Sequence, residues 1–303
     1  MSDINILTEN MKKINSLKIE KNKMLAPYTS FKVGGPADLF VEAETVKSLQ
    51  KALPLIVKSG LPYFVLGKGS NLITSDKGYR GIIIYTGSLR NYTVEDNTVK
   101  AESGLLLSEL ADICCKASLS GLEFASGIPG SLGGAVYMNA GAYGREMKDV
   151  IKKAELLQQN GEIIELSRQE LQLDYRSSIL QSKNYIITSA TLELESGDKE
   201  KIQKQIDKLH AKRWSKQPME QPSAGSIFKR PPGHYTGPLI EKAGMKGYQI
   251  GGAQVSTKHA GFIVNKGNAT SDDIINLIEK VKEEVYKISG VRLEVEPRLL
   301  GKF

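Results

Sequence analysis

The stretch from residue 121 to residue 144, GLEFASGIPGSLGGAVYMNAGAYG, constrains the fold more than any other part of the chain. It holds seven glycines in 24 residues and neither lysine nor arginine. Glycine loses the most conformational freedom on folding, so it is placed where the backbone needs a positive φ or must approach another group closely. A structureless loop of this length is usually functional. The stretch therefore predicts backbone packed against a ligand, with an elaborate turn as the alternative.

A phosphate fits this stretch. Successive N–H groups of Gly127, Ile128, Gly130 and Ser131, in a run that also contains Pro129, could form an anion nest. The pair Gly133 and Gly134 would let the chain pack under a flat ring.

A second glycine loop, YFVLGKGSNLI at 63–73, follows a predicted strand. Gly67 and Gly69 flank Lys68, and Ser70 and Asn71 offer polar side chains. A dinucleotide-binding fingerprint leads into a helix, whereas ITSDKGYRG leads into a turn and another strand, and no GxxxxGK[ST] motif occurs. A phosphate cradle and a tight turn between strands both remain open here.

Composition narrows the class of protein. The 303 residues predict two or three compact units, and 40% hydrophobic with 25% charged residues is typical of a soluble chain without membrane insertion. The N-terminus lacks the apolar stretch of a secretory signal, so we expect a cytoplasmic location. The two cysteines are adjacent in one predicted helix and the three histidines are scattered, which predicts neither a structural disulfide nor a metal site. The net charge of +7, without a nucleic-acid motif, favours a small anionic ligand over nucleic acid.

Sheet and helix alternate along the chain. Apolar periodicity predicts strands at 38–42, 63–66 and 184–194, helices at 45–60, 106–118 and 271–289, and a hairpin over 154–166. Asn160-Gly161 is typical of a type I′ turn in that hairpin. Thr270 and Asp273 have capping-box spacing, and Gly290 stops the last helix. VRLEVEP at 291–297 alternates as a strand that Pro297 ends or kinks.

These motifs together resemble a known family. GKGSN followed by GIPGSLGGAVYMNAGAYG is similar to FAD-binding domains of the vanillyl-alcohol-oxidase (PCMH) type. YTSFKVGGPAD, LDYRSS, QPSAGSIFKRP, LIEKAGMKGYQIGGAQVSTKHAGFIVN and LEVEPRLLG extend the resemblance over nearly the whole chain, to the family of UDP-N-acetylenolpyruvoylglucosamine reductases. The resemblance implies an α+β fold, with a two-part FAD-binding domain and a C-terminal α/β substrate domain. We expect residues 1–92 and 93–212 to form the two FAD-binding subdomains and residues 213–303 to form the substrate-binding domain.

The resemblance also implies a reaction. NADPH reduces a non-covalently bound FAD and leaves. UDP-N-acetylenolpyruvoylglucosamine then takes the same pocket and accepts hydride from flavin N5 at its C3, giving UDP-N-acetylmuramate for peptidoglycan synthesis. The chain is similar to the shorter family form, which lacks an inserted tyrosine-bearing lid, and a monomer is expected.

Three residues match the family's catalytic positions. Arg176 would bind the carboxylate that gains charge during reduction, although a surface ion pair is the commoner role of an arginine. Ser226 would protonate C2, although such a serine elsewhere would be assigned to a turn or cap. Glu296 would lie near Arg176, and spacing alone does not distinguish it from Glu294. Proline follows Glu296 where relatives commonly have valine.

The remaining site residues are also implied by the resemblance. Lys229 and Arg230 would bind the diphosphate or carboxylate, or form a solvated basic turn. His259 either lines the pocket or is structural. The cofactor would be held by residues of the two glycine loops: Gly67, Lys68, Gly69, Ser70, Asn71, Gly127, Ile128, Pro129, Gly130, Ser131, Gly133, Gly134, Asn139 and Gly141.

Two other functions stay open. The FAD loops alone would also allow a flavin oxidase, which would consume oxygen without oxidising NADPH. A non-catalytic binder of anionic nucleotides could use the same loops and lysines, but it would not need Arg176, Ser226 and Glu296 together.

Overall fold

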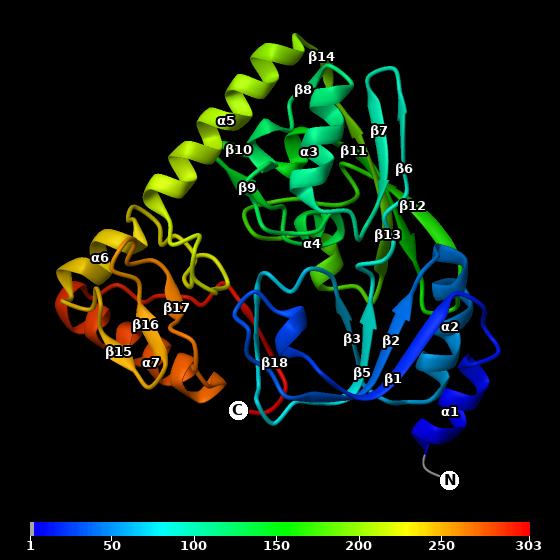
Figure 1. The fold of residues 1–303 in the computed structure, drawn as a ribbon, viewed down its shortest axis with the longest axis horizontal. Helices are drawn as coiled ribbons and strands as arrows, with labels where there is room; N and C mark the ends of the chain where they lie inside the picture. Colours follow the sequence, from blue (N-terminus) through cyan, green and yellow to red (C-terminus); the bar gives the residue numbers. More distant parts are fainter. Residues whose placement is uncertain (1–2) are drawn as a thin grey trace. The chain divides into compact units, whose positions relative to one another are not determined.

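The computed structural model describes residues 3–303, and its chain divides into two compact units (Figure 1). Unit 1 covers Met1–Lys21, Leu39–Lys68 and Gly81–Ala211, and unit 2 covers Asn22–Asp38, Gly69–Arg80 and Lys212–Phe303. The three-part division expected from the sequence stays a prediction. Both units mix helices with strands, which confirms the α+β class.

Most residues of two sheets lie in unit 1, and three strands of the first sheet have a few residues in unit 2. The first has the strand order β1-β2-β5-β3, and the second is a five-stranded sheet of order β12-β11-β13-β7-β6. Small pairs β9–β10 and β8–β14 accompany them. The elements are α1 (Asp3–Met11), β1 (Leu17–Met24), β2 (Pro36–Ala43), α2 (Val46–Lys58), β3 (Tyr63–Leu66), β5 (Tyr79–Tyr85), β6 (Tyr92–Glu95), β7 (Thr98–Glu102), α3 (Leu107–Lys116), β8 (Leu119–Ser120), α4 (Leu132–Tyr137), β9 (Gly141–Ala142), β10 (Arg145–Glu146), β11 (Ile151–Leu157), β12 (Ile163–Ser167), β13 (Ile186–Glu193), β14 (Glu195–Ser196) and α5 (Lys199–Lys216).

Helix α2 shows how local sequence sets these elements. Thr45 accepts a hydrogen bond from Ser48 N–H in a capping box, and the apolar face of the helix packs into the core of the first sheet. Helices α3 and α4 pack on the second sheet around a separate core that includes Leu110 and Val136. Each sheet of unit 1 therefore has its own hydrophobic core.

Unit 2 is built around helix α7. Thr270 and Asp273 form the expected capping box, and Gly290 ends the helix with a φ of 70°. Its apolar stripe packs against the sheet β15-β16-β17 and helix α6. The elements are β4 (Leu72–Thr74), α6 (Thr236–Lys242), β15 (Gln249–Ile250), β16 (Ala253–Val255), β17 (Ile263–Asn265), α7 (Ser271–Ser289) and β18 (Arg298–Leu300), with β4 and β18 pairing in parallel.

Three local predictions are wrong. The glycine-rich stretch is not structureless, because it contains helix α4, a 3-10 turn at Glu123–Ala125 and strand β9. The hairpin of β11 and β12 forms, but of Asn160 and Gly161 only Gly161 has positive φ, at 91°. Gly161 N–H donates to Gln158 O, so the turn lies one residue earlier than a type I′ turn would place it.

The third concerns VRLEVEP, which forms no regular strand. Only Val295 makes a bridge, to Phe228, and β18 begins after Pro297, which has no N–H to continue a ladder.

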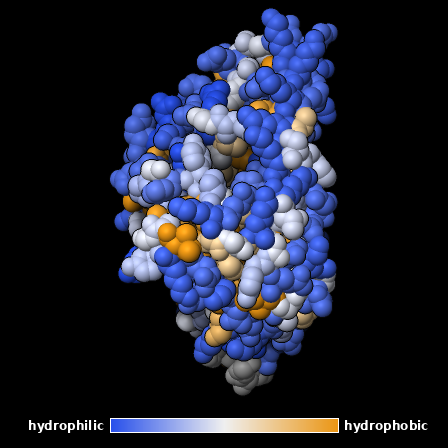
Figure 2. Space-filling model, turned by 90° about the vertical axis from the view of Figure 1, so that its left-hand side faces the viewer, coloured by the Kyte–Doolittle hydropathy of each residue, from blue (hydrophilic) through white to orange (hydrophobic). Residues whose placement is uncertain are grey.

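The surface in Figure 2 is mostly hydrophilic, with apolar side chains scattered in small separate spots. In the part of the chain that the structure describes, every helix is too short or too polar to cross a membrane.

Candidate active site

The two glycine loops meet in unit 1. A Cβ atom built on Gly67 would lie 2.4 Å from Ser131 Oγ, so the end of strand β3 passes directly beside the start of helix α4. Such an approach excludes a larger side chain at Gly67 unless the serine hydroxyl turns away. The close contact of these loops is what a shared cofactor site requires.

The start of helix α4 is held by the segment that follows strand β7. Leu132 N–H donates to Leu105 O and Gly133 N–H donates to Ser103 O, both at 2.8 Å. A Cβ atom on Gly133 would lie 2.8 Å from Ser103 Cβ. Gly133 is therefore required by packing within the protein, and its N–H is already used.

The proposed anion nest has fewer donors than the sequence suggested. Ile128 N–H donates to Ala125 O at 2.9 Å, and Gly130 N–H donates to Ile128 O at 2.8 Å. Pro129 has no N–H. Of the five nest residues, only Gly127 and Ser131 have N–H groups outside these turns.

Gly134 tests whether the chain fits a flavin. It lies in helix α4 and is exposed. Apart from the backbone of the helix itself, a Cβ atom there would touch only Ser131 Oγ among residues 3–303, at 3.6 Å. Glycine in a helix costs about 0.5–1 kcal/mol relative to alanine, and within residues 3–303 the single contact with Ser131 Oγ gives no packing reason for that cost. A flat ring lying on this face of α4 would explain the glycine, so the residues fit FAD.

From Gly69 onward, the glycine loop at 63–73 belongs to unit 2. Gly69 has a φ of 66°, and a Cβ atom there would lie 2.1 Å from Tyr28 O, so glycine is needed for the fold itself. Lys68 is exposed and Ser70 half-buried. Asn71 Nδ2 donates to Glu296 O at 3.4 Å, and Asn71 O accepts from Arg298 N–H at 3.0 Å. Asn71 thus ties the glycine loop at 63–73 to the segment that carries Glu296.

Asn139 is fully engaged by protein groups in unit 1. Its side chain is completely buried, and its Nδ2 donates to Glu146 Oε2 and to Asp174 O, each at 3.0 Å. Its Oδ1 accepts from Lys148 N–H at 2.9 Å. The amide therefore holds the loop after α4 to the loop of Arg176 and has no remaining N–H for a cofactor.

Arg176 lies in the loop of residues 174–177, which the Asn139 amide contacts at Asp174 O. Asp174 and Ser177 exchange two backbone hydrogen bonds across a tight turn, and Arg176 has a φ of 53° inside it. Arg176 is half-buried, and its guanidinium carbon lies over the Tyr175 ring, 5.1 Å from the ring centre. Gln181 Nε2 donates to both Arg176 O and Tyr137 O, which ties the turn to the end of α4.

Gly141 is needed for packing, because a Cβ there would lie 2.6 Å from Arg145 O.

Unit 2 brings Ser226 and Glu296 together. Glu296 N–H donates to Ile227 O at 2.9 Å, and Phe228 bridges Val295, so the two residues lie on adjacent antiparallel segments. Both side chains are half-buried. The predicted proximity of Arg176 to Glu296 stays a prediction, because Arg176 belongs to unit 1.

The two candidate glutamates have different surroundings in the structure. Glu294 is exposed and its carboxylate pairs with Lys229 Nζ, whereas Glu296 is half-buried beside Asn71 and Ile227. A diphosphate would have to share Lys229 with Glu294. Arg230 is exposed and stacks 3.9 Å from the ring centre of Tyr235.

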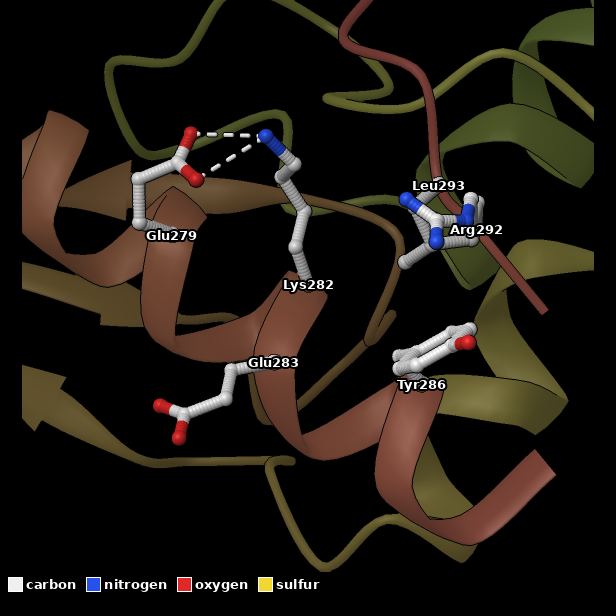
Figure 3. Close-up of a pocket in the computed structure, with 6 residues that line it drawn as sticks. All are labelled: Glu279, Lys282, Glu283, Tyr286, Arg292 and Leu293. Carbon is white, nitrogen blue, oxygen red and sulfur yellow. Dashed lines mark hydrogen bonds and ion pairs between the residues drawn. The ribbon is translucent and has the colours of Figure 1, made fainter. Parts of the chain in front are cut away.

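One surface hollow lies elsewhere in unit 2. It has a volume of about 330 Å³, and Figure 3 shows Arg292 lying against Tyr286 and Lys282 paired with Glu279. None of the predicted site residues lines it. Within residues 3–303, no group of three or more histidines, cysteines and acidic residues could hold a metal ion.

Two residues near the cofactor loops were not identified from the sequence. Ser103 Oγ is buried, and no protein atom of residues 3–303 bonds to it. Gly104 is enclosed, because a Cβ atom there would lie 2.2 Å from Thr86 O. The only local signal in the sequence was Gly104 itself, which follows Ser103 directly after strand β7.

Comparison with known proteins now identifies the family. Residues 217–300 match the profile of the UDP-N-acetylenolpyruvoylglucosamine reductase C-terminal domain, and residues 37–167 match that of an FAD binding domain. The UDP-N-acetylenolpyruvoylglucosamine reductase of Caldanaerobacter subterraneus subsp. tengcongensis is 48% identical over 298 residues, 98% of this chain and 99% of the relative. The chain belongs to the UDP-N-acetylenolpyruvoylglucosamine reductase family.

Other family members agree with this result. The reductase of Alkaliphilus oremlandii is 50% identical over 276 residues, 91% of each chain. The crystal structure of the Thermus caldophilus reductase has a TM-score of 0.82 and 35% identity over 94% of this chain and 99% of that one. A Physcomitrella patens BBE-like protein shares only the fold, at 16% identity and a TM-score of 0.51 over 63% of this chain. Like its family, the chain is an FAD-containing oxidoreductase, as the sequence predicted.

Proposed function

We propose that this chain reduces UDP-N-acetylenolpyruvoylglucosamine to UDP-N-acetylmuramate with NADPH, as a step of peptidoglycan precursor synthesis. The observation that carries the proposal is the likeness to reductases of this name over 98% of the chain. The adjacent positions of Ser226 and Glu296 in unit 2 agree with it. The cytoplasmic location and the monomeric state stay predictions.

A bound flavin would supply the redox chemistry, because FAD can accept hydride from NADPH and pass it on to C3 of the enolpyruvyl group. Hydride at C3 places negative charge on C2 and the carboxylate, and a proton at C2 completes the reduction. Ser226 is the proposed donor of that proton. An enolate is a strong enough base to take a hydroxyl proton when the geometry is fixed.

The cationic residues stabilise the charge that builds up on the substrate. Arg176 can bind the carboxylate with two parallel N–H···O bonds, which suits a planar guanidinium. Glu296 orients Arg176 or stabilises the enolic species. Lys229 and Arg230 bind the diphosphate, with Lys229 exchanging its present partner Glu294 for phosphate oxygens.

Residues of the two loops hold the flavin in this proposal. Gly134 provides the open face of α4, and the N–H groups of Gly127 and Ser131 supply the donors that the turns leave for the diphosphate. The fully bonded amide of Asn139 positions the Arg176 turn instead of contacting FAD.

The purified protein tests the proposal directly. It should carry a flavin spectrum, and UDP-N-acetylenolpyruvoylglucosamine should reoxidise the NADPH-reduced form without oxygen. If oxygen alone reoxidises the flavin and NADPH does not reduce it, the chain is an oxidase and the proposal is wrong.

The variant Ser226→Ala tests the proton donor. NADPH should still reduce the flavin at the wild-type rate, while reoxidation by the enolpyruvyl substrate slows by about 10²-fold or more, the usual size of general acid catalysis. Ser223→Ala, three residues earlier and also half-buried, is the matched control and should change neither rate. Unchanged reoxidation by Ser226→Ala would remove Ser226 from the mechanism.

A further inference from the structure

His259 takes part in the hydrogen bonding of the turn between strands β16 and β17. Gly261 N–H donates to His259 Nδ1 at 3.1 Å, and Phe262 N–H donates to His259 O at 3.0 Å. A ring nitrogen accepts a hydrogen bond only when it carries no proton, so the ring proton lies on Nε2. This turn therefore requires a neutral imidazole.

The same turn contacts the segment of Ser226. Ile227 N–H donates to Gly261 O at 2.9 Å, and Ser226 forms an antiparallel bridge with Phe262. The imidazole also lies edge-on to the Phe262 ring, with the ring centres 5.1 Å apart. The N–H of Gly261 thus bonds to His259, and its carbonyl oxygen bonds to Ile227, the residue after Ser226.

We propose that neutral His259 is a positioning residue for Ser226, and that its protonation releases the turn and misplaces the proton donor. The proposal rests on the role given to Ser226 above. It assigns His259 no contact with substrate or flavin.

The surroundings of His259 keep it neutral. Burial lowers the pKa of the imidazole below its ordinary 6.5. A hydrogen bond with the backbone of its own residue and the charge of Glu241 on α6 raise this pKa, and Lys246 lowers it, but burial is the largest effect and the net shift is downward. Glu241 and Lys246 pair with each other at 2.8 Å. On the turn itself, Lys258 pairs with Glu220 at 3.6 Å. The turn is therefore intact at neutral pH and loses the acceptor at Nδ1 only in acid.

Two variants separate the acceptor from the rest of the side chain. In His259→Asn, the amide oxygen can take the place of Nδ1 and does not titrate, whereas His259→Leu offers no acceptor. Both half-reactions are followed by stopped-flow absorbance of the flavin between about pH 5 and pH 8, a range around the ordinary histidine pKa.

We expect His259→Leu to slow reoxidation by UDP-N-acetylenolpyruvoylglucosamine by about 10- to 100-fold, as a misplacement near 1 Å does, and to leave reduction by NADPH unchanged. His259→Asn should react near the wild-type rate and should lack the fall in rate that the wild type shows in acid. His234→Asn, which changes an exposed histidine of the same unit, is the control and should keep that fall.

A ¹⁵N NMR spectrum of the wild-type histidines supplies a test that is independent of turnover. It should show Nδ1 of His259 unprotonated at pH 7. A proton on Nδ1, an unchanged reoxidation rate in His259→Leu, or an acid fall that persists in His259→Asn would each overturn the role of His259 alone. If the reduced wild type does not react with the substrate at all, the proposed function itself fails.

Discussion

Gly134 and Gly133 are neighbours in helix α4, yet the structure predicts opposite effects of alanine at the two positions. At Gly134 a methyl group enters open space, touching only Ser131 Oγ at 3.6 Å. Replacing glycine by alanine at a compatible position stabilises a protein by about 0.4–1 kcal/mol, so the flavin-free variant should unfold a few degrees higher than the wild type. At Gly133 the methyl group would lie 2.8 Å from Ser103 Cβ, and overpacking of this kind costs about 1–3 kcal/mol.

The alanine that stabilises the flavin-free protein at Gly134 should weaken the binding of FAD. If the ring lies on the open face of α4, the methyl group of Gly134→Ala occupies part of its space, and a clash of about 1.4 kcal/mol or more weakens FAD binding by about tenfold or more. Thermal unfolding of the flavin-free proteins measures the first effect, and titration with FAD, followed by the quenching of its fluorescence, measures the second. A Gly134→Ala variant that binds FAD as tightly as the wild type would refute the assignment of this face to the flavin.

Three further predictions follow from single side chains. Asn139→Ala should lower the free energy of unfolding by about 2–4 kcal/mol, because it leaves Lys148 N–H without its acceptor and puts alanine in the left-handed region. Glycine tolerates the φ of 42° at this position, so Asn139→Gly should lower the free energy of unfolding by less in the same urea titration. Burial raises the pKa of the Cys114 thiol to about 12, so a thiol reagent at pH 8 should not modify Cys114 until the protein unfolds, as mass mapping can show. The hydrogen bond from Thr270 N–H lowers the pKa of the Asp273 carboxyl below 3.8. The stabilising contribution of this carboxylate is therefore complete above pH 3.8 and is lost as the pH falls through the lowered pKa. Asp273→Asn should flatten the acid part of the profile of unfolding free energy against pH, measured by urea titration.

Much of the secondary structure follows from local sequence. The helix at 271–289 begins and ends at the predicted residues, because its capping box, its apolar stripe and Gly290 all lie within one short segment. Helix α2 lies within the predicted 45–60 and strand β3 covers the predicted 63–66, because the apolar face of the helix and the short apolar run of the strand are also local signals. The hairpin was also predictable, but its turn type was not, since Asn160-Gly161 fits more than one turn.

The failures arise where long-range contacts decide the outcome. VRLEVEP alternates like a strand, but the segment it meets at Phe228 offers a single bridge, and Pro297 interrupts the backbone before β18. Glu294 and Glu296 have the same place in that alternation. Only the fold makes one an exposed partner of Lys229 and the other a half-buried neighbour of Asn71.

The sequence by itself determined the family, the cofactor class and the residue types at the site, because these depend on motifs that are read along the chain. The tertiary structure decided what each glycine and each polar group does. It shows that Gly69 and Gly133 are required for close packing within the protein, whereas Gly134 leaves open space for a ligand. It also shows that the side-chain amide of Asn139 forms its hydrogen bonds with groups of the protein itself. Such roles depend on which distant backbone atoms come within 3 or 4 Å, and pairs such as Gly67 and Ser131 are neighbours only after folding.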